Sequence, residues 1–250
     1  MSRKDETPLM ISIVIPAYNE KRRIQGSLSE VFAFMNDSGI AYEIVVVDDG
    51  SADGTGRIVE HIAKNVRDVR LVRYEKNKGK GHALRTGVLV TNGDFVLVMD
   101  ADLSTPMAEL RKLMPYLSDG GFDIAIGSRA LALSDIIKKQ PWWRRGMGKT
   151  FNKLVKTLVI GGFSDTQCGF KLFKGEIARS LFGEAKIDRF AYDVEILALA
   201  KKYGYGIKEV PIRWINSPES RVDPVKDSLQ MLVDLIRIRF AVGKVKGKGS

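Results

Sequence analysis

The chain has 250 residues, of which 44% are hydrophobic and 28% charged, as in ordinary globular proteins that can build one sizeable core. A single cysteine, Cys168, excludes an internal disulfide, and no cysteines and histidines have the spacing of a zinc site. No run of about eighteen apolar residues and no N-terminal signal-peptide pattern occur, so we expect a cytoplasmic protein that does not span a membrane.

The net charge of +10 is distributed unevenly. The stretch from Ile136 to Ser164 has no acidic residue, yet its basic residues are Lys138, Lys139, Arg144, Arg145, Lys149, Lys153 and Lys156. A second basic cluster closes the chain at Arg237, Arg239, Lys244, Lys246 and Lys248. Such patches attract phosphate on nucleic acids, nucleotides or anionic lipids, and charge alone does not choose among them.

Strands and helices alternate through the first half of the chain, which predicts βαβ units and a mostly parallel sheet. The expected strands are Ile11–Ile15, Glu43–Val47, Val69–Tyr74, Phe95–Met99 and Asp123–Ile126. The expected helices between them are Glu20–Asp37, Gly54–Asn65, Gly79–Thr91 and Pro106–Leu117. The second half predicts helices at Trp143–Val159, Ile177–Gly183 and Tyr192–Tyr203, a strand at Ile207–Trp214, and a last helix from Pro224 to about Phe240.

Polar and charged segments follow the predicted strands. They read PAYNE (16–20), DDGSADG (48–54), EKNKGKG (75–81), DADLS (100–104) and GSRA (127–130). Because open α/β sheets bind ligands outside the carboxyl ends of their strands, we expect these segments to form one site.

Asp100 and Asp102 end the apolar run FVLVM, and an ionised carboxylate is costly to bury unless a cation meets it. Two carboxylates one residue apart can bind one Mg²⁺ or Mn²⁺, with phosphate and water filling the other positions. The alternative is a capped strand end, with Ser104 or Thr105 beginning the next helix. The polar strand ends nearby favour the metal.

Two further segments are suited to binding a nucleotide. Asp48 or Asp49 can accept hydrogen bonds from a uracil imide or a ribose hydroxyl, although an Asp/Gly turn before a helix is the structural alternative. Lys80 stands beside Gly79 and Gly81 at a predicted helix start, where ammonium and backbone N–H groups suit phosphate. The segment lacks the spacing of a P-loop, so hydrolysis of a nucleoside triphosphate is not indicated.

Several motifs occur together in a recognisable order: SIVIPAYNE, IVVVDDGSADGT, NKGKGHALRTG, VMDADLSTP, IGSR, DTQCGFKLF and FAYDVEIL. With them the chain resembles the family 2 glycosyltransferases of the GT-A fold, a Rossmann-like α/β fold, over about Ile11 to Phe240. Within that family it is most similar to the polyprenyl-phosphate sugar synthases, the dolichyl-phosphate β-glucosyltransferases especially. We expect one GT-A domain over residues 1–223 and a C-terminal amphipathic helix with a basic tail over 224–250.

The resemblance implies roles for individual residues. The residues expected to bind the donor are Pro16, Tyr18, Glu20, Asp48, Asp49, Lys80, Asp100 and Arg129, of which Arg129 faces either the donor or the acceptor phosphate. Asp100 and Asp102 are expected to bind the metal. Asp165, Gln167, Lys171 and Arg221 are expected to bind the acceptor, although Asp165, Gln167 and Lys171 could instead form a turn and a helix cap. Asp193 and Asp102 are the expected catalytic residues. Ser104 and Arg221 stand where related mannosyltransferases carry Gln and Lys, so the resemblance names no third metal ligand and does not favour mannose.

The expected reaction is an inverting, metal-dependent transfer of a hexose, glucose from UDP-glucose, to a polyprenyl or dolichyl phosphate. A lipid phosphate is already anionic and needs no strong base, so Asp193 would orient the acceptor or the sugar. With a hydroxyl acceptor it would be the general base. The alternative to a functional role is that Asp193 and Glu195 lie on the solvated face of an amphipathic helix.

The alternatives for function are another donor (GDP-mannose, UDP-GlcNAc or UDP-GalNAc), a glycan hydroxyl acceptor, or a basic nucleic-acid-binding protein. The last of these leaves the acidic strand ends unexplained.

The last helix carries two apolar stripes. Val225, Leu229, Leu232, Ile236 and Phe240 form one, and Met231, Leu235, Ile238 and Val242 form the other. With the basic residues nearby, this pattern predicts contact with an anionic membrane surface. The alternative is that the C-terminal helices pack on each other or on a homodimer partner. The segment from Trp142 to Ile160 has the same blend of aromatic, apolar and basic side chains. We therefore expect a peripheral protein at the inner face of the membrane.

Overall fold

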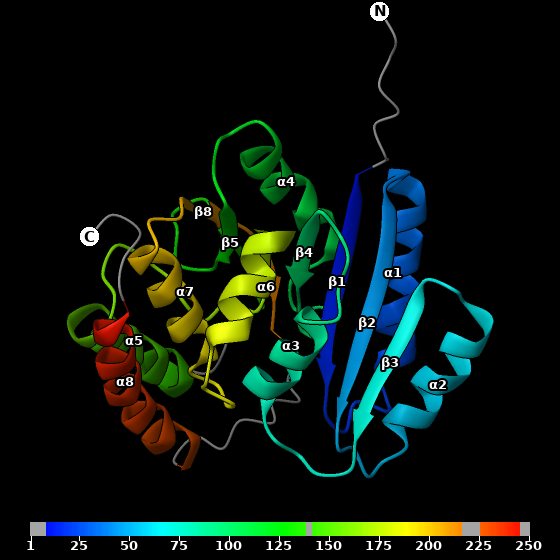
Figure 1. Cartoon of the computed structure of the whole chain (residues 1–250), viewed down its shortest axis with the longest axis horizontal. Helices are drawn as coiled ribbons and strands as arrows, with labels where there is room; N and C mark the ends of the chain where they lie inside the picture. Colours follow the sequence, from blue (N-terminus) through cyan, green and yellow to red (C-terminus); the bar gives the residue numbers. More distant parts are fainter. Residues whose placement is uncertain (1–8, 139–141, 217–225, 246–250) are drawn as a thin grey trace, which may run out of the picture.

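The computed structural model describes residues 9–138, 142–216 and 226–245, and at its centre is a seven-stranded sheet (Figure 1). Its strands are β1 (Met10–Ala17), β2 (Ala41–Asp49), β3 (Val69–Tyr74), β4 (Phe95–Val98), β5 (Ile124–Ser128), β7 (Lys171–Lys174) and β8 (Ile207–Pro211). They lie in the order β3-β2-β1-β4-β7-β5-β8, and β7 alone among them runs antiparallel to its neighbours. The predicted mostly parallel sheet is confirmed.

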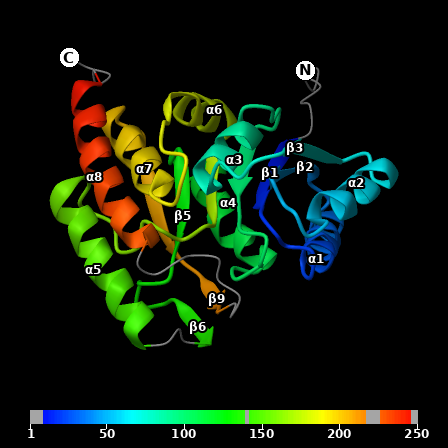
Figure 2. The same cartoon turned by 90° about the horizontal axis from the view of Figure 1, so that it is seen from below.

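Helices cover both faces of the sheet. They are α1 (Ile24–Ser38), α2 (Thr55–Asn65), α3 (Lys80–Val88), the short 3-10 helix η1 (Met107–Glu109), α4 (Leu110–Ser118), α5 (Trp142–Leu158), α6 (Gly175–Glu184), α7 (Tyr192–Lys202) and α8 (Lys226–Lys244). Figure 2 shows α3 and α6 on one side of the sheet and α1 on the other. Strand residues alternate accordingly: Ile13 packs with α1, α2 and α4, whereas Val14 packs with the cluster of α3, α5, α6, α7 and α8.

The strand expected over residues 207–214 is divided in the structure. It ends as β8 at Pro211, which has no N–H to donate, and continues as β9 (Arg213–Ile215) in a different sheet. There β9 pairs in parallel with β6 (Asp135–Lys138), which the sequence pattern did not reveal. Strand β7 was also missed, because its four residues, KLFK, are too few and too polar to distinguish from a turn.

The two stripes predicted for the last helix lie on different faces of α8. Met231, Leu235 and Ile238 are buried with the core cluster that includes α5 and α7. The other face leaves Leu229, Leu232, Val233, Ile236 and Phe240 exposed; here we call it the α8 outer face. Val225 and the predicted domain boundary at residues 223/224 lie outside the described residues, so that boundary stays a prediction. None of the helices in the described ranges has the length and apolar character needed to cross a bilayer.

Candidate active site

The predicted strand ends converge at one edge of the sheet. Strands β1, β2, β4 and β5 end there, and the antiparallel β7 begins there. Its first residue, Lys171, is in register with Val98 of β4 and Ile126 of β5. Because parallel sheets of this kind bind ligands at their carboxyl edge, β7 adds a lysine to a site that is otherwise built by the ends of parallel strands.

Asp100 and Asp102 stand on the turn after β4, and the cation that meets Asp100 is a lysine. Nζ of Lys80, the first residue of α3, lies 2.5 Å from Oδ1 of Asp100. Oδ1 of Asp102 instead accepts a hydrogen bond from the amide of Ser104, at 3.0 Å. Burial acts to raise the pKa of Asp100, but the positive charges of Lys80, then of Lys171 and Arg129, hold the pKa below its ordinary value.

Backbone contacts fix the surroundings of this ion pair. A side chain at Gly169 would come within 2.2 Å of Oδ2 of Asp100, so glycine allows the carboxylate to lie against the loop before β7. On the other side, the amides of Lys78 and Gly79 donate to Asp49, at 2.7 and 2.9 Å, and hold the start of α3. The backbone that carries Lys80 is therefore anchored, while the side chains of both members of the ion pair remain partly exposed.

A second ion pair, between Lys171 and Asp193 in the first turn of α7, is almost completely removed from water. Their side chains are 2% and 4% exposed, and Lys171 also donates to the carbonyl oxygen of Cys168. Burial raises the pKa of Asp193, although Lys171 and Lys80 act in the opposite direction. Asp193 is thus not on the solvated helix face that was the alternative interpretation.

Glu195 is not on a solvated face either. Its carboxylate is buried and accepts hydrogen bonds from the amides of Lys186 and Ile187, at 2.8 to 3.0 Å. Burial raises the pKa of Glu195, while these hydrogen bonds lower it in part. The residue therefore holds the loop between α6 and α7 and lies outside the cluster of charges at the sheet edge.

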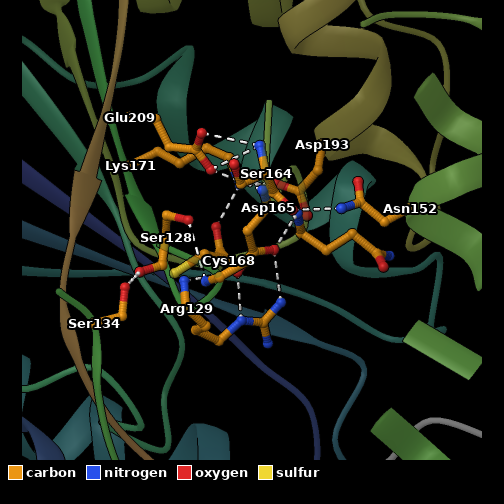
Figure 3. Close-up of polar contacts among 12 residues, drawn as sticks. Ser128, Arg129, Ser134, Asn152, Ser164, Asp165, Cys168, Lys171, Asp193 and Glu209 are labelled. Atoms are coloured by element: carbon orange, nitrogen blue, oxygen red, sulfur yellow. Dashed lines mark hydrogen bonds and ion pairs between the residues drawn. The ribbon is translucent and has the colours of Figure 1, made fainter. Parts of the chain in front are cut away.

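Arg129 and Asp165 form a bidentate ion pair close to the buried pair of Lys171 and Asp193 (Figure 3). Nε and NH2 of Arg129 donate to the two oxygens of Asp165 at 2.7 and 2.9 Å, and the Arg129 amide donates at 3.0 Å. Burial would raise the pKa of Asp165, but the Arg129 guanidinium and these hydrogen bonds lower it to about 2. Asp165 also accepts from the amide of Gln167 at 3.1 Å, so it organises the loop before β7.

Glu209 of β8 holds the same loop, and sequence reasoning missed it. Its carboxylate accepts hydrogen bonds from the amides of Ser164 and Asp165, at 2.7 to 3.0 Å (Figure 3). The available signal was an acidic residue within the apolar strand pattern at 207–214. Cys168 lies in the same loop; burial, with the nearby Asp165 carboxylate, raises the pKa of its thiol to about 11, which agrees with the expected packing role.

The residues expected to bind the nucleoside lie where β1 and β2 end. Asp49 is 2% exposed and Asp48 is fully buried, so both carboxylates have partners inside the protein: Asp48 accepts from the amide of Ser51 at 3.0 Å. Pro16 is partly buried at the end of β1, and Tyr18 is 38% exposed. Glu20 is paired with Arg23. The structure thus leaves Tyr18 accessible at this edge, whereas Asp49 is bound to the loop before α3 and Asp48 is paired with Ser51 and with Arg73 of β3.

The residues present fit a divalent cation whose remaining ligands come from substrate. Across the described ranges, no group of three or more His, Cys, Asp or Glu side chains is placed to hold a metal ion. Asp100 and Asp102 supply two carboxylates, and Mg²⁺ or Mn²⁺ is commonly bound through one or two carboxylates together with substrate phosphates and water. Arg221, expected to bind the acceptor, lies outside the described residues.

Comparison with known proteins gives consistent relatives. The chain is 37% identical over 243 residues to a dolichyl-phosphate beta-glucosyltransferase of Dictyostelium discoideum, covering 93% of this chain and 74% of the relative. It is 35% identical over 253 residues to the human enzyme of the same name, covering 96% and 78%. The Saccharomyces cerevisiae enzyme of that name is 34% identical over 255 residues, covering 95% and 76%.

Solved structures share the fold. A mannosyl-3-phosphoglycerate synthase from Rubrobacter xylanophilus is 20% identical with a TM-score of 0.69, covering 97% of this chain and 77% of that one. A glucosyl-3-phosphoglycerate synthase from Mycobacterium tuberculosis, solved with Mn²⁺, UDP-glucose and phosphoglyceric acid, is 20% identical with a TM-score of 0.68, covering 94% and 80%. Residues 12–182 match the family described as Glycosyl transferase family 2. With its mostly parallel sheet and the acidic turn after β4, the chain therefore belongs to glycosyl transferase family 2 and is a glycosyltransferase.

Proposed function

We propose that this glycosyltransferase transfers glucose from UDP-glucose to a polyprenyl or dolichyl phosphate, with inversion at the anomeric carbon. The observation that carries the proposal is the set of relatives, at 34–37% identity over nearly the whole chain, that bear the name dolichyl-phosphate beta-glucosyltransferase. The acidic turn at Asp100 and Asp102 supports it, since it lies at the edge of the sheet where a nucleotide would bind. Family membership also favours an enzyme over the nucleic-acid-binding alternative.

The donor side of the proposed site is formed by residues from β1, β2, β4 and α3. Tyr18, Pro16 and Glu20 face the nucleoside, and Asp48 and Asp49 shape the turn beside it. Asp100 and Asp102 hold Mg²⁺ or Mn²⁺, and the bound ion neutralises charge that grows on the departing nucleoside diphosphate. Either ion suits two carboxylates completed by phosphate.

The acceptor side is formed around the loop before β7. A phosphate monoester attracts cations, and Arg129 and Lys171 bring two of them to this loop. Asp165 and Gln167 fix the loop, and Arg221 is the further residue expected there. A lipid phosphate oxygen is anionic at pH 7, so the reaction needs no strong base. The buried, ion-paired Asp193 then orients the acceptor by positioning Lys171.

A panel of labelled donors tests the substrates. UDP-glucose, GDP-mannose, UDP-GlcNAc and UDP-GalNAc are each offered with dolichyl phosphate, and separately with a glycan hydroxyl acceptor, in Mg²⁺, in Mn²⁺ or in chelator. We expect label in the lipid fraction from UDP-glucose with metal, and none with chelator. Preferred transfer from another donor, or to the hydroxyl acceptor, would contradict the proposal.

Asp102→Asn tests the metal role within the same assay. We expect a loss of transfer of about 100-fold or more, because a bound cation supplies several kcal/mol of charge stabilisation. Asp119→Asn is a matched control, since Asp119 is an exposed aspartate at the end of α4. Full activity of the Asp102 variant, or transfer that persists in chelator, would exclude a metal at this turn.

Asp193→Asn separates the two roles of that residue. For a lipid phosphate acceptor we expect a partial loss of turnover with UDP-glucose binding intact. Near-complete loss of turnover with intact donor binding would instead indicate a general base. Because the substitution leaves Lys171 without its charge partner, the unfolding midpoint must be measured beside the activity.

The proposed location is peripheral, at the inner face of the membrane, through the α8 outer face. Leu229, Ile236 and Phe240 of that face are 54–66% exposed, and the exposed Arg237 and Arg239 suit anionic headgroups. The side chains of Trp142 and Trp143, expected to take part, lie outside what the structure describes. A homo-oligomer partner on the α8 outer face is the second possibility to be tested.

Flotation with anionic liposomes tests this location. We expect the protein to float with the vesicles, and the double variant Ile236→Ser/Phe240→Ser to float less while keeping its unfolding midpoint. Protein that stays in the soluble fraction with every vesicle, and that elutes as a dimer which the variant dissociates, would contradict the membrane and favour the second copy.

A further inference from the structure

The ion pair between Lys80 and Asp100 stands where the proposed metal must bind. Its N–O distance is 2.5 Å, and the two side chains are 23% and 38% exposed. Oδ2 of the same carboxylate lies against Gly169, where even a Cβ would come within 2.2 Å. The loop before β7 therefore blocks one side of the carboxylate while the lysine occupies another.

Among the described residues, three cationic side chains face four carboxylates in this cluster, so one negative charge has no cationic partner. Lys171 is paired with Asp193, Arg129 with Asp165 and Lys80 with Asp100, which leaves Asp102 as the carboxylate of this cluster without a cationic partner in the described structure. A divalent cation bound alone would add two positive charges beside the Lys80 ammonium, and like charges that share one carboxylate repel strongly. A divalent cation that arrives with a diphosphate adds no net positive charge, because the diphosphate carries at least two negative charges at pH 7.

The side chain of Lys80 has room to change its partner, whereas that of Lys171 does not. The backbone before Lys80 is held by hydrogen bonds from Lys78 and Gly79 to Asp49. Beyond this anchor extends a four-carbon side chain with several rotatable bonds. The ring of Tyr192, whose centroid lies 5.6 Å from Nζ, offers the ammonium a cation–π contact beside Asp100. The ammonium can therefore change partner by side-chain rotation alone. The Lys171 side chain, 2% exposed, has no comparable freedom.

We infer that Lys80 occupies the cation position on Asp100 in the ligand-free enzyme and yields it when a nucleoside diphosphate arrives, turning its ammonium toward the diphosphate. Metal and nucleotide then bind cooperatively, and the carboxylates do not collect metal on their own. This inference rests on the proposed donor site and deepens it. It assigns Lys80 a role as an internal competitor of the metal, in addition to a donor contact.

Mn²⁺ binding to the full chain tests the inference without any transfer reaction. Free Mn²⁺ is followed by electron paramagnetic resonance, with and without UDP, for the wild type and for Lys80→Met. For the wild type we expect weak binding of Mn²⁺ alone and a strong increase in affinity with UDP. For Lys80→Met we expect Mn²⁺ alone to bind at least about tenfold more tightly, because the competing charge is gone, and the effect of UDP to shrink.

Lys174→Met is the matched control. Lys174 pairs with Asp123 at 2.9 Å, its side chain is 35% exposed, and it lies at the opposite end of β7 from Lys171. It removes the same charge from the chain, so we expect Mn²⁺ binding like that of the wild type. Lys80→Gln is a second variant without the charge, in case Lys80→Met does not fold. Circular dichroism of each variant, compared with the wild type, shows whether it is folded.

Two results overturn the inference: Mn²⁺ alone binds to both folded Lys80 variants no more tightly than to the wild type, or UDP increases Mn²⁺ affinity equally in all proteins. Either result leaves the transfer assay untouched, so a failure here is distinct from a failure of the proposed function. Conversely, the protein could show the expected changes in Mn²⁺ affinity and still not transfer glucose. That result would support Lys80 as the competitor of the metal and reject the proposed substrate.

Discussion

The two lysine–aspartate pairs of the site differ chiefly in their access to water. Lys171 and Asp193 are 2% and 4% exposed, and the lysine is held further by the carbonyl of Cys168. Lys80 and Asp100 have the same chemistry, yet they are 23% and 38% exposed. The first pair is closed off from water, whereas the second is partly open to it.

This difference indicates a division of labour. A buried ion pair costs desolvation and is strongly destabilising to break, so it fixes geometry. A partly exposed pair contributes little to stability, so its members can exchange partners at a small cost. The second half of the chain thus supplies the rigid side of the site, formed by β7 and α7. The first half supplies Lys80 and Asp100, which can respond to a ligand.

Lys171→Met should have the largest effect on this contrast. It leaves the Asp193 carboxylate buried without a cation, and we expect the free energy of unfolding to fall by about 3–5 kcal/mol. Chemical denaturation followed by circular dichroism measures it.

The double variant Lys171→Met/Asp193→Asn serves as its control. Since it removes both charges, it should be less destabilised than the sum of the two single variants. A loss below about 1 kcal/mol for Lys171→Met would be typical of a surface pair, and the contrast between the two pairs would then disappear.

The second buried ion pair of the site, between Arg129 and Asp165, should make the stability of the protein depend on pH. The pKa of Asp165 is about 2 in the folded protein, against 3.8 for the free side chain. A lowered pKa contributes stability that is complete above the unfolded value and lost as the pH falls through the folded value. The expected contribution is about 2 kcal/mol, present above about pH 5 and lost between about pH 4 and pH 2.

Urea unfolding of the wild type and Asp165→Asn at a series of pH values checks this. The difference between the two proteins should narrow as the pH falls toward 2. Asp37→Asn is the control, because Asp37 forms an exposed pair with Arg111 and should change stability by no more than about 0.5 kcal/mol. A difference that stays constant with pH would mean that Arg129 does not stabilise the ionised Asp165 in the fold.

The sequence predicted the first half of the molecule better than the second for a physical reason. Parallel strands such as β1 and β2 are covered on both faces, so their continuous apolar runs are visible without any partner. Strand β7 has four residues, two of them lysines, and it is a strand only because β4 and β5 lie on either side of it. Likewise β9 leaves the main sheet after Pro211, which no local pattern indicates.

The candidate site shows the same limit. Asp100 and Asp102 could be found because an acidic pair after an apolar run is unusual, and the sequence also predicted a cation beside them. That Lys80 meets Asp100, and that Asp193 lies buried against Lys171, depends on the distance between segments far apart in the chain. Burial decides whether a carboxylate is free to bind a ligand, and burial is a property of the packed fold.

Lys80→Met should have the smallest effect on stability, which makes it the sharpest test of the contrast. Its ion pair is partly exposed, so we expect the free energy of unfolding to change by less than about 1 kcal/mol, measured by denaturation without metal. Lys174→Met, in a pair of similar exposure, should behave alike. A loss of several kcal/mol for Lys80→Met, as expected for Lys171→Met, would mean that Lys80 is as fixed as Lys171. An ammonium held that firmly could not give up Asp100 to a metal.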